Sequence, residues 1–150
     1  MEKKLICFFD GACAPKNPHG HIGMGYFIKE GDVIIHAESR YREARNGNTN
    51  NIAEYGALYY LLKYLIDNQM NSYDIQVFGD STLVIHQMSL IWKIKKGGYA
   101  QAAMACKELL SRFNNIRFTW IPREENKLAD QLSNKILLEK GIKLFQKPTN

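Results

Sequence analysis

The stretch Lys4-Leu-Ile-Cys-Phe-Phe-Asp10 decides the fold expected of this chain. Residues 5–9 are apolar, and a run this short and aromatic predicts a strand buried on both faces of a sheet rather than a helix. The run ends at Asp10 and Gly11, which predicts a carboxylate at the C-terminal end of a central strand, where sites on open α/β sheets gather. An isolated Asp-Gly pair is more typical of a turn, so Asp10 is a candidate metal ligand only if other acids converge on it.

Size and composition predict one globular domain over residues 1–150, with a basic tail at 142–150 as a candidate flexible segment. A hydrophobic content of 45% and a charged content of 23% are ordinary for a soluble protein with a core. The three cysteines, Cys7, Cys13 and Cys106, have neither disulfide-framework nor zinc-ligand spacing, which favours a reducing, cytoplasmic location.

Charge and hydropathy limit the kinds of partner. No stretch approaches membrane-spanning length, so we expect no membrane association. The formal net charge of +5 is a mild hint of a polyanionic partner. No protein partner is indicated, and we expect a monomer.

The periodicity of apolar residues predicts the order β-β-β-α-β-α-α-β-α. The expected strands are 4–10, 21–28, 33–41, 74–79 and 116–121, and the expected helices are 52–66, 83–88, 100–113 and 125–139. A polar loop is expected over 11–20, and Gly23 and Gly25 within the second strand suggest a close backbone approach or a bulge. Three antiparallel strands followed by strand–helix units indicate an α/β fold with a mixed sheet and helices on both faces.

Four acids stand near the ends of these expected elements. Asp10 ends the first strand, and Asp80 follows the fourth. Glu54 lies in the first turn of the long helix, and Asp130 lies in the first half of the last helix, where a solvated acid is ordinary. Glu54 also has an ordinary explanation as the capping-box partner of Asn51, and Asp80 has one as a plain N-cap.

These ordinary explanations of the single acids become unfavourable when the four acids are considered as a set. Glu54 stands on a helix whose surface is mostly apolar, where an unpaired carboxylate would be costly. A cluster of acids at strand ends repels itself unless a cation neutralises it. Oxygen donors without nearby His or Cys favour Mg²⁺ or Mn²⁺ over Zn²⁺. Convergence of the four acids would therefore define a divalent metal site.

Four motifs follow one another along the chain. They are Phe9-Asp10-Gly11-Ala12-Cys13, Thr49-Asn50-Asn51-Ile52-Ala53-Glu54, Phe78-Gly79-Asp80-Ser81 and Trp120-Ile121-Pro122-Arg123-Glu124-Glu125-Asn126-Lys127-Leu128-Ala129-Asp130. On the expected elements, this set resembles ribonuclease H, type 1, from the first strand to the last helix. The resemblance implies a ribonuclease H-like mixed five-stranded sheet, with three antiparallel strands and then two parallel ones, and helices on both faces.

The resemblance also implies an activity. Members of the family hydrolyse the RNA strand of RNA–DNA hybrids and leave 5′-phosphate and 3′-hydroxyl ends. Carried over by motif, Asp10, Glu54, Asp80 and Asp130 are the catalytic residues and hold two Mg²⁺ ions, which Mn²⁺ can replace. One ion would supply hydroxide at neutral pH, and the other would stabilise the leaving 3′-oxygen. Asp10 is the expected bridging ligand, and Asp130 is the expected mobile one.

Hybrid selectivity requires contacts to 2′-hydroxyl groups in the wide minor groove. The family's positions for these contacts map to Cys13, Asn17, Asn50 and Asn51, and Thr49 matches the position that holds a DNA phosphate. A buried thiol at Cys13 and turn or cap roles for the asparagines remain the ordinary alternatives.

The segment 92–99 places aromatic residues beside lysines. Trp92 suits a DNA sugar, and Lys93, Lys95 and Lys96 suit phosphates; a solvated loop with Trp92 anchored in the core is the alternative. Many bacterial members carry a longer basic insertion here, so this short form is expected to bind hybrids more weakly or with more salt sensitivity.

The loop before the last helix lacks the histidine that many members use in proton transfer or product release. Glu124 or Glu125 is a candidate replacement, although acids near a helix N-terminus also complement the helix dipole. Two other functions remain open. They are a catalytically silent nucleic-acid-binding domain and another ribonuclease H-like nuclease, such as a junction resolvase.

Overall fold

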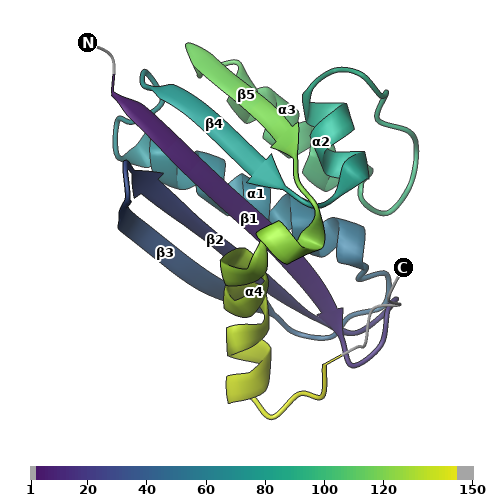
Figure 1. Ribbon diagram of the computed structural model, residues 1–150. Coiled ribbons are helices and arrows are strands. Elements are labelled where there is room, and N and C mark those ends of the chain that lie inside the picture. The colour runs from purple at the N-terminus through teal and green to yellow at the C-terminus, as the bar shows by residue number, and fades with distance from the viewer. Residues whose placement is uncertain (1–2, 145–150) are drawn as a thin grey trace.

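The computed structural model describes residues 3–144, which form one five-stranded mixed sheet with helices on both faces (Figure 1). The strands are β1 (Lys4–Ala14), β2 (His21–Glu30), β3 (Val33–Arg42), β4 (Asp74–Gly79) and β5 (Asn115–Trp120). The helices are α1 (Asn50–Asp67), α2 (Thr82–Met88), α3 (Ala100–Leu110) and α4 (Lys127–Glu139), and the short 3₁₀ helix η1 (Arg123–Glu125) precedes α4.

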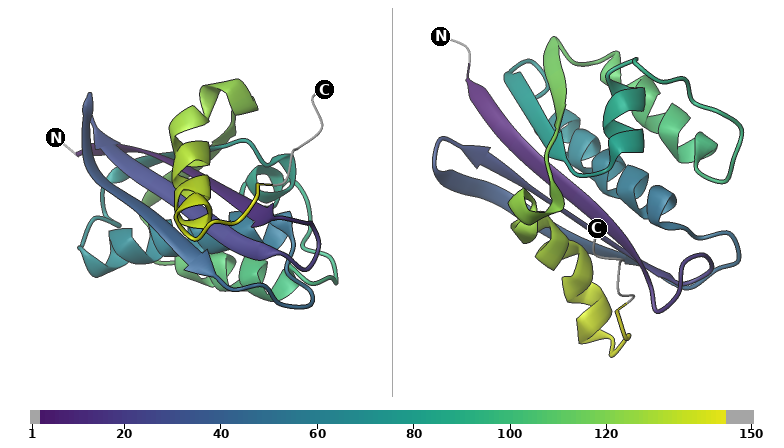
Figure 2. Two further views of the ribbon diagram at one scale, coloured as in Figure 1. Left: turned by 90° about the horizontal axis from the view of Figure 1, so that it is seen from below. Right: turned by 45° about the vertical axis from the view of Figure 1, so that its right-hand side comes forward.

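The sheet order is β3-β2-β1-β4-β5. β1, β2 and β3 pair antiparallel, whereas β4 pairs parallel with both β1 and β5. Helices α1 and α3 cover one face, and α4 crosses the other over β1, β2 and β3 (Figure 2). This arrangement confirms the fold class expected from the order of the elements.

The main core lies between the sheet and α1. Leu58, Leu61 and Leu62 of α1 are fully buried, and they meet apolar side chains such as Leu5 and Phe9 of β1. The aromatic run at the start of the chain is therefore a central strand, as expected. Cys7, Cys13 and Cys106 are all buried and free.

Strand β1 is longer than expected, which corrects two predictions. The expected loop over 11–20 is wrong for its first four residues, because β1 continues to Ala14. Asp10 therefore lies inside a strand and does not end it. The reason is that β1 keeps pairing with β2 as far as Ala14↔His21, whereas its pairing with β4 stops at Phe8↔Phe78.

Several element boundaries also differ from those expected. Helix α1 begins at Asn50 because the Thr49 side chain caps it, accepting a hydrogen bond from the Ile52 N–H. α3 ends at Leu110, three residues early, and α4 begins at Lys127 after η1. Residues 145–150 of the expected tail lie outside the described residues.

Glycines mark the places where helices pack directly on the sheet. A Cβ atom on Gly23 would come within 1.9 Å of the Ser133 carbonyl oxygen of α4, and one on Gly25 within 2.4 Å of the Ser133 nitrogen. The predicted close approach at these strand glycines is confirmed. Within residues 3–144, the structure contains no helix that is long and apolar enough to span a membrane.

Candidate active site

Three of the four predicted acids converge. Asp10, Glu54 and Asp80 each offer a carboxylate oxygen, and these oxygens all lie within 4.8 Å of one another. Asp10 comes from the middle of β1, Glu54 from the first turns of α1, and Asp80 directly follows β4. The predicted convergence of these side chains, which are distant in the sequence, is therefore observed.

The local structure explains how the acids meet. β1 and β4 stop pairing after Phe8↔Phe78, so the sheet opens at Asp10 and Asp80. α1 approaches β1 closely at the same level, because a Cβ atom on Gly11 would lie only 2.3 Å from the Ala53 carbonyl carbon. That contact of backbone on backbone brings Glu54, the next residue of α1, to the opening.

Burial and charge at this cluster favour a hard cation. Asp10 is fully buried, Glu54 is 5% exposed and Asp80 is half-buried. Carboxylates this close repel each other unless a positive charge compensates them. Oxygen donors without His or Cys among them fit Mg²⁺ or Mn²⁺ rather than Zn²⁺.

The ordinary explanations for two of these acids are wrong. The N-cap of α1 is Thr49, so Glu54 does not complete a capping box with Asn51. The N-cap of α2 is Ser81, whose side chain accepts the Val84 N–H, so Asp80 is not the cap.

Asp130 does not join the group of three. It lies in α4, half-buried, and lines a small pocket of about 130 Å³ together with Cys13, Asn50 and Arg123. The structure thus places Asp130 beside predicted substrate residues, on the α4 side of β1.

Asn126 was not singled out by sequence reasoning, yet it contacts the acid cluster. Its Nδ2 donates to the Asp80 Oδ2 at 2.9 Å and to the Phe9 carbonyl oxygen at 2.9 Å. Trp120 was also missed, and its Nε1 donates to the Asp80 carbonyl oxygen at 3.1 Å. The expected helix 125–139 includes Asn126, and no sequence signal predicts that its amide turns into the sheet.

The predicted minor-groove residues form a hydrogen-bonded chain at the end of β1. The Cys13 N–H donates to Asn50 Oδ1 at 2.8 Å, and the Asn50 N–H donates to Asn17 Oδ1 at 3.2 Å. The Cys13 thiol is buried and donates to the Lys16 carbonyl oxygen at 3.3 Å, and burial raises its pKa. Asn51, by contrast, is exposed.

The segment 92–99, the basic loop, is largely exposed. Contacts with the core and with α2 hold it in place. Trp92 is 45% exposed with its ring 4.4 Å from that of His86, so the alternative of a core-anchored Trp92 is wrong. Ile94 packs on the core instead, and Gln87 Nε2 donates to the Lys93 carbonyl oxygen at 3.1 Å. The predicted phosphate-facing residues Lys93, Lys95 and Lys96 are all exposed.

Glu124 and Glu125 lie in η1 and are exposed. Neither belongs to the first turn of α4, where the acid is Asp130. They are instead the acids of the first turn of η1, directly before α4, so the explanation as acids near a helix N-terminus applies to them as well as the catalytic one.

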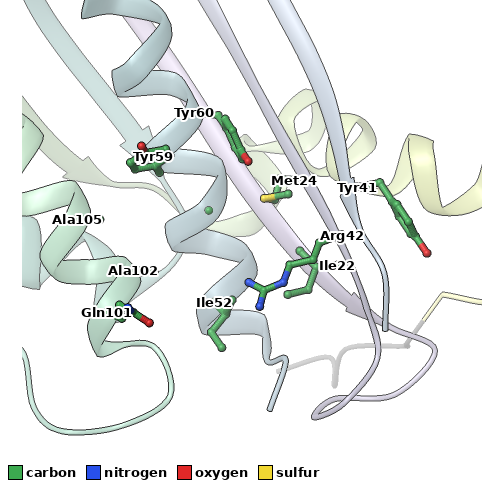
Figure 3. Close-up of a pocket in the computed structure, with 11 residues that line it drawn as sticks. Ile22, Met24, Tyr41, Arg42, Ile52, Tyr59, Tyr60, Gln101, Ala102 and Ala105 are labelled. Atoms are coloured by element: carbon green, nitrogen blue, oxygen red, sulfur yellow. The ribbon is translucent and has the colours of Figure 1, made fainter. Parts of the chain in front are cut away.

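A separate cavity of about 420 Å³ lies between β2, β3, α1 and α3 (Figure 3). Its lining is mainly apolar and aromatic, with the Arg42 guanidinium pointing in beside Ile52. None of the four acids lines this cavity, so the candidate active site is the carboxylate cluster on the sheet.

A sheet of this order, opened at its centre around carboxylates, defines a ribonuclease H-like domain. A family model described as reverse transcriptase-like matches residues 8–136. Ribonuclease HI of Halobacterium salinarum is 35% identical over 134 residues, which cover 89% of this chain and 64% of that protein.

Two solved structures are similar throughout. The crystal structure of RNase H1 from Halobacterium salinarum has a TM-score of 0.79 at 30% identity, and it covers 91% of this chain and 98% of that one. LC11-RNase H1 in complex with an RNA/DNA hybrid has a TM-score of 0.70 at 30% identity, covering 87% and 94%. The chain belongs to the ribonuclease H family, type 1. It spans between 35% and 64% of the length of the curated relatives that it matches.

Proposed function

We propose that this chain is an endonuclease that hydrolyses the RNA strand of RNA–DNA hybrids and leaves 5′-phosphate and 3′-hydroxyl ends. The observation that carries the proposal is the meeting of Asp10, Glu54 and Asp80 within 4.8 Å. The relative named Ribonuclease HI and the similar structure bound to an RNA/DNA hybrid support the choice of substrate. A concentration of negative charge would serve no purpose in a silent binding domain, because phosphate must approach there.

Asp10, Glu54 and Asp80 are the residues that would hold two divalent ions, with Asp130 as a further ligand from α4. The donor set is oxygen only, which fits Mg²⁺ and allows Mn²⁺ in its place. When bound, such ions supply an activated water and stabilise the leaving oxygen of an in-line displacement. The acids themselves set the position of the cations on a rigid support, because Asp10 sits in the central strand.

The surface around the acids suits the two strands of a hybrid. Asn17 and Asn50 are polar groups of the kind that reads 2′-hydroxyls in the minor groove. Cys13 is only 1% exposed and its N–H is bonded to Asn50 Oδ1, so its proposed part in this contact is to hold the Asn50 side chain in place. Trp92 and the three loop lysines are assigned to the DNA strand, and so is Thr49.

Glu124 and Glu125 are proposed as alternatives for the task of the missing loop histidine, supported by their exposure beside Asn126. Glu124→Gln and Glu125→Gln would be compared in multiple-turnover cleavage. Rates equal to wild type in both variants would remove both residues from the mechanism.

The function is tested with three duplexes of one sequence, an RNA–DNA hybrid, a double-stranded RNA and a double-stranded DNA, each labelled on one strand at a time. We expect cleavage of the hybrid's RNA strand alone, with 5′-phosphate ends on the products. Cleavage of a branched DNA junction would favour the resolvase alternative. Binding of the hybrid without cleavage in Mg²⁺ or Mn²⁺ would instead mean a silent binding domain.

A further inference from the structure

Asn126 occupies a helix-cap position without acting as a cap. It is the residue before α4, where asparagine ordinarily accepts a hydrogen bond from the helix through its side chain. Here the side chain makes no capping hydrogen bond and is buried, with the residue only 1% exposed. Capping therefore does not explain an amide at this position.

The amide reaches into the sheet at the point where the acids meet. Figure 1 shows the segment before α4 passing over β1 beside the end of β4. Asn126 Nδ2 donates to the carbonyl oxygen of Phe9, the residue before Asp10, and to the Asp80 carboxylate, both at 2.9 Å. One side chain from the α4 segment thus ties β1 to the end of β4, beyond the last paired residues Phe8 and Phe78.

The chemistry of the two partners dictates which way the amide faces. A carbonyl and a carboxylate are both acceptors, so only the NH₂ group satisfies them, and it has the two protons that they need. A hydrogen bond to one oxygen of Asp80 fixes the plane of the carboxylate and leaves the lone pairs of the other oxygen for a cation. The neutral amide achieves this without adding a charge to the acid cluster.

We propose that Asn126 is a positioning residue for the metal centre, which holds the Asp80 carboxylate in the orientation that binds a divalent cation. The proposal rests on the proposed function, because it assumes that Asp80 is a metal ligand. Without the amide, Asp80 would turn freely, and the repulsion from Asp10 and Glu54 would push it away. Side chains that orient metal ligands in this way are typically worth about 10- to 100-fold in metal affinity or activity.

The test uses Asn126→Ala and Asn126→Leu, of which the second keeps the number of side-chain heavy atoms and removes both donors. The matched control is Asn48→Ala. Asn48 is also 1% exposed, and its Nδ2 also donates two hydrogen bonds, to the carbonyl oxygens of Gly20 and Glu43, but it does not contact the acids. The dissociation constant of Mn²⁺ is measured by calorimetry in the absence of nucleic acid, alongside hybrid cleavage.

We expect both Asn126 variants to bind Mn²⁺ about 10- to 100-fold more weakly than wild type. Their kcat should fall at low Mg²⁺ and recover in part at high Mg²⁺, with the KM for the hybrid unchanged, because the defect lies in holding the cation. Asn48→Ala should lose stability and keep the wild-type Mn²⁺ affinity.

Wild-type Mn²⁺ affinity in either Asn126 variant would overturn the positioning role, and so would failure of both variants to fold, since the contact would then serve folding. Wild-type protein and Asp80→Asn separate this outcome from failure of the proposed function. If the wild type neither binds Mn²⁺ nor cleaves the hybrid, the proposed function itself fails. If it does both while the Asn126 variants match it, only the role of Asn126 fails.

Discussion

The Glu54 side chain has opposite effects on function and on the stability of the fold. Its carboxylate is a candidate ligand, yet it is 5% exposed and lies close to the carboxylates of Asp10 and Asp80. Like charges at this spacing oppose folding unless a cation offsets them. Sites of this kind commonly trade stability for function.

We therefore predict that Glu54→Gln raises the free energy of unfolding by about 1 kcal/mol in EDTA and abolishes cleavage. In saturating Mg²⁺ the wild type should be the more stable of the two proteins, because it gains cation-binding energy that the variant lacks. Urea unfolding under both conditions measures the effect, with the exposed Glu108→Gln as control. A variant less stable than wild type in EDTA would show that the acids do not strain the fold.

The carboxylate of Glu38, which lies outside the acid cluster, should make the stability of the fold depend on pH. Burial raises its pKa, but hydrogen bonds from Tyr26 and Arg40 outweigh this, so that the pKa lies below the ordinary 4.5. A carboxyl with a lowered folded-state pKa stabilises the fold above its unfolded pKa, and this contribution is lost as the pH falls through the folded pKa.

Glu38→Gln should accordingly lower the free energy of unfolding at pH 7 by about 1.5–3 kcal/mol, the range for hydrogen bonds to charged groups. The difference from wild type should shrink below pH 4.5 as Glu38 is protonated in the wild type. Urea titrations from pH 7 to pH 3 measure it, with the exposed Glu30→Gln as control. A difference that stays constant with pH would contradict the charged network.

At the scale of elements, the contact of α1 with β1 at Gly11 positions the site. A Cβ atom there would meet backbone atoms of Ala53 and Glu54 at 2.3–2.6 Å, and backbone cannot move aside as a side chain can. Gly11→Ala should destabilise the fold by about 1–3 kcal/mol or more and weaken Mn²⁺ binding, because α1 carries Glu54. Thermal unfolding and calorimetry test this.

Gly98→Ala is the matched control, since the nearest atoms to its Cβ position lie 3.9 Å away. It should leave the melting temperature nearly unchanged. If Gly11→Ala were equally neutral, the close packing of α1 on β1 would not be what places Glu54.

The basic loop gives a prediction about salt. Changing Lys93, Lys95 and Lys96 together to Gln should reduce the slope of log affinity against log salt by about 0.9 for each phosphate that the loop no longer neutralises, or about 2–3 in all. Hybrid binding by the Asp10→Asn protein at several salt concentrations measures the slope. The control changes Lys63, Lys107 and Lys140 together to Gln, which removes the same charge outside the loop. An equal reduction of the slope in this control would attribute the effect to net charge.

The elements also show where sequence reasoning succeeds and where it stops. The apolar run at residues 5–9 was enough to place a central strand, because burial on both faces leaves a strong local pattern. The extension to Ala14 was missed, because Gly11 is a turn signal locally and only the ladder with β2 overrides it. The strand glycines, Gly23 and Gly25, did predict the close approach, since few other roles suit glycine inside a strand.

The residues of the site can also be divided into those that the sequence predicts and those that it does not. Glu54 was predicted partly because an acid on an apolar helix is locally anomalous. Asp10 and Asp80 have ordinary local explanations and were predicted only as members of a set that resembles the ribonuclease H motifs; the structure brings all three together. The contacts of Asn126 were not predictable, because the expected helix 125–139 includes Asn126 and no local pattern indicates that its amide reaches the Asp80 carboxylate. The separation of Asp130 from the group also depends on how α4 packs on β2, which no local pattern encodes.

The whole molecule is needed to assemble the acid cluster. Its members come from β1, α1 and the end of β4, so no single hairpin or strand–helix unit contains the site. The sequence as a whole is positive, with a net charge of +5 that includes these acids, which favours approach of a polyanion to a cluster that cations neutralise. The proposed function therefore requires both a bound divalent cation and a nucleic-acid substrate.

One measurement tests that claim most directly. Chelator-treated wild type and Asp10→Asn are each given an RNA–DNA hybrid with different labels on its two strands, and Mg²⁺ is titrated in. We predict cleavage of the RNA strand by the wild type only, appearing with Mg²⁺ and absent from Asp10→Asn at every concentration, although the variant still binds the hybrid. Cleavage without a divalent cation, or equal cleavage by Asp10→Asn, would contradict the assignment of the carboxylate cluster as the catalytic centre.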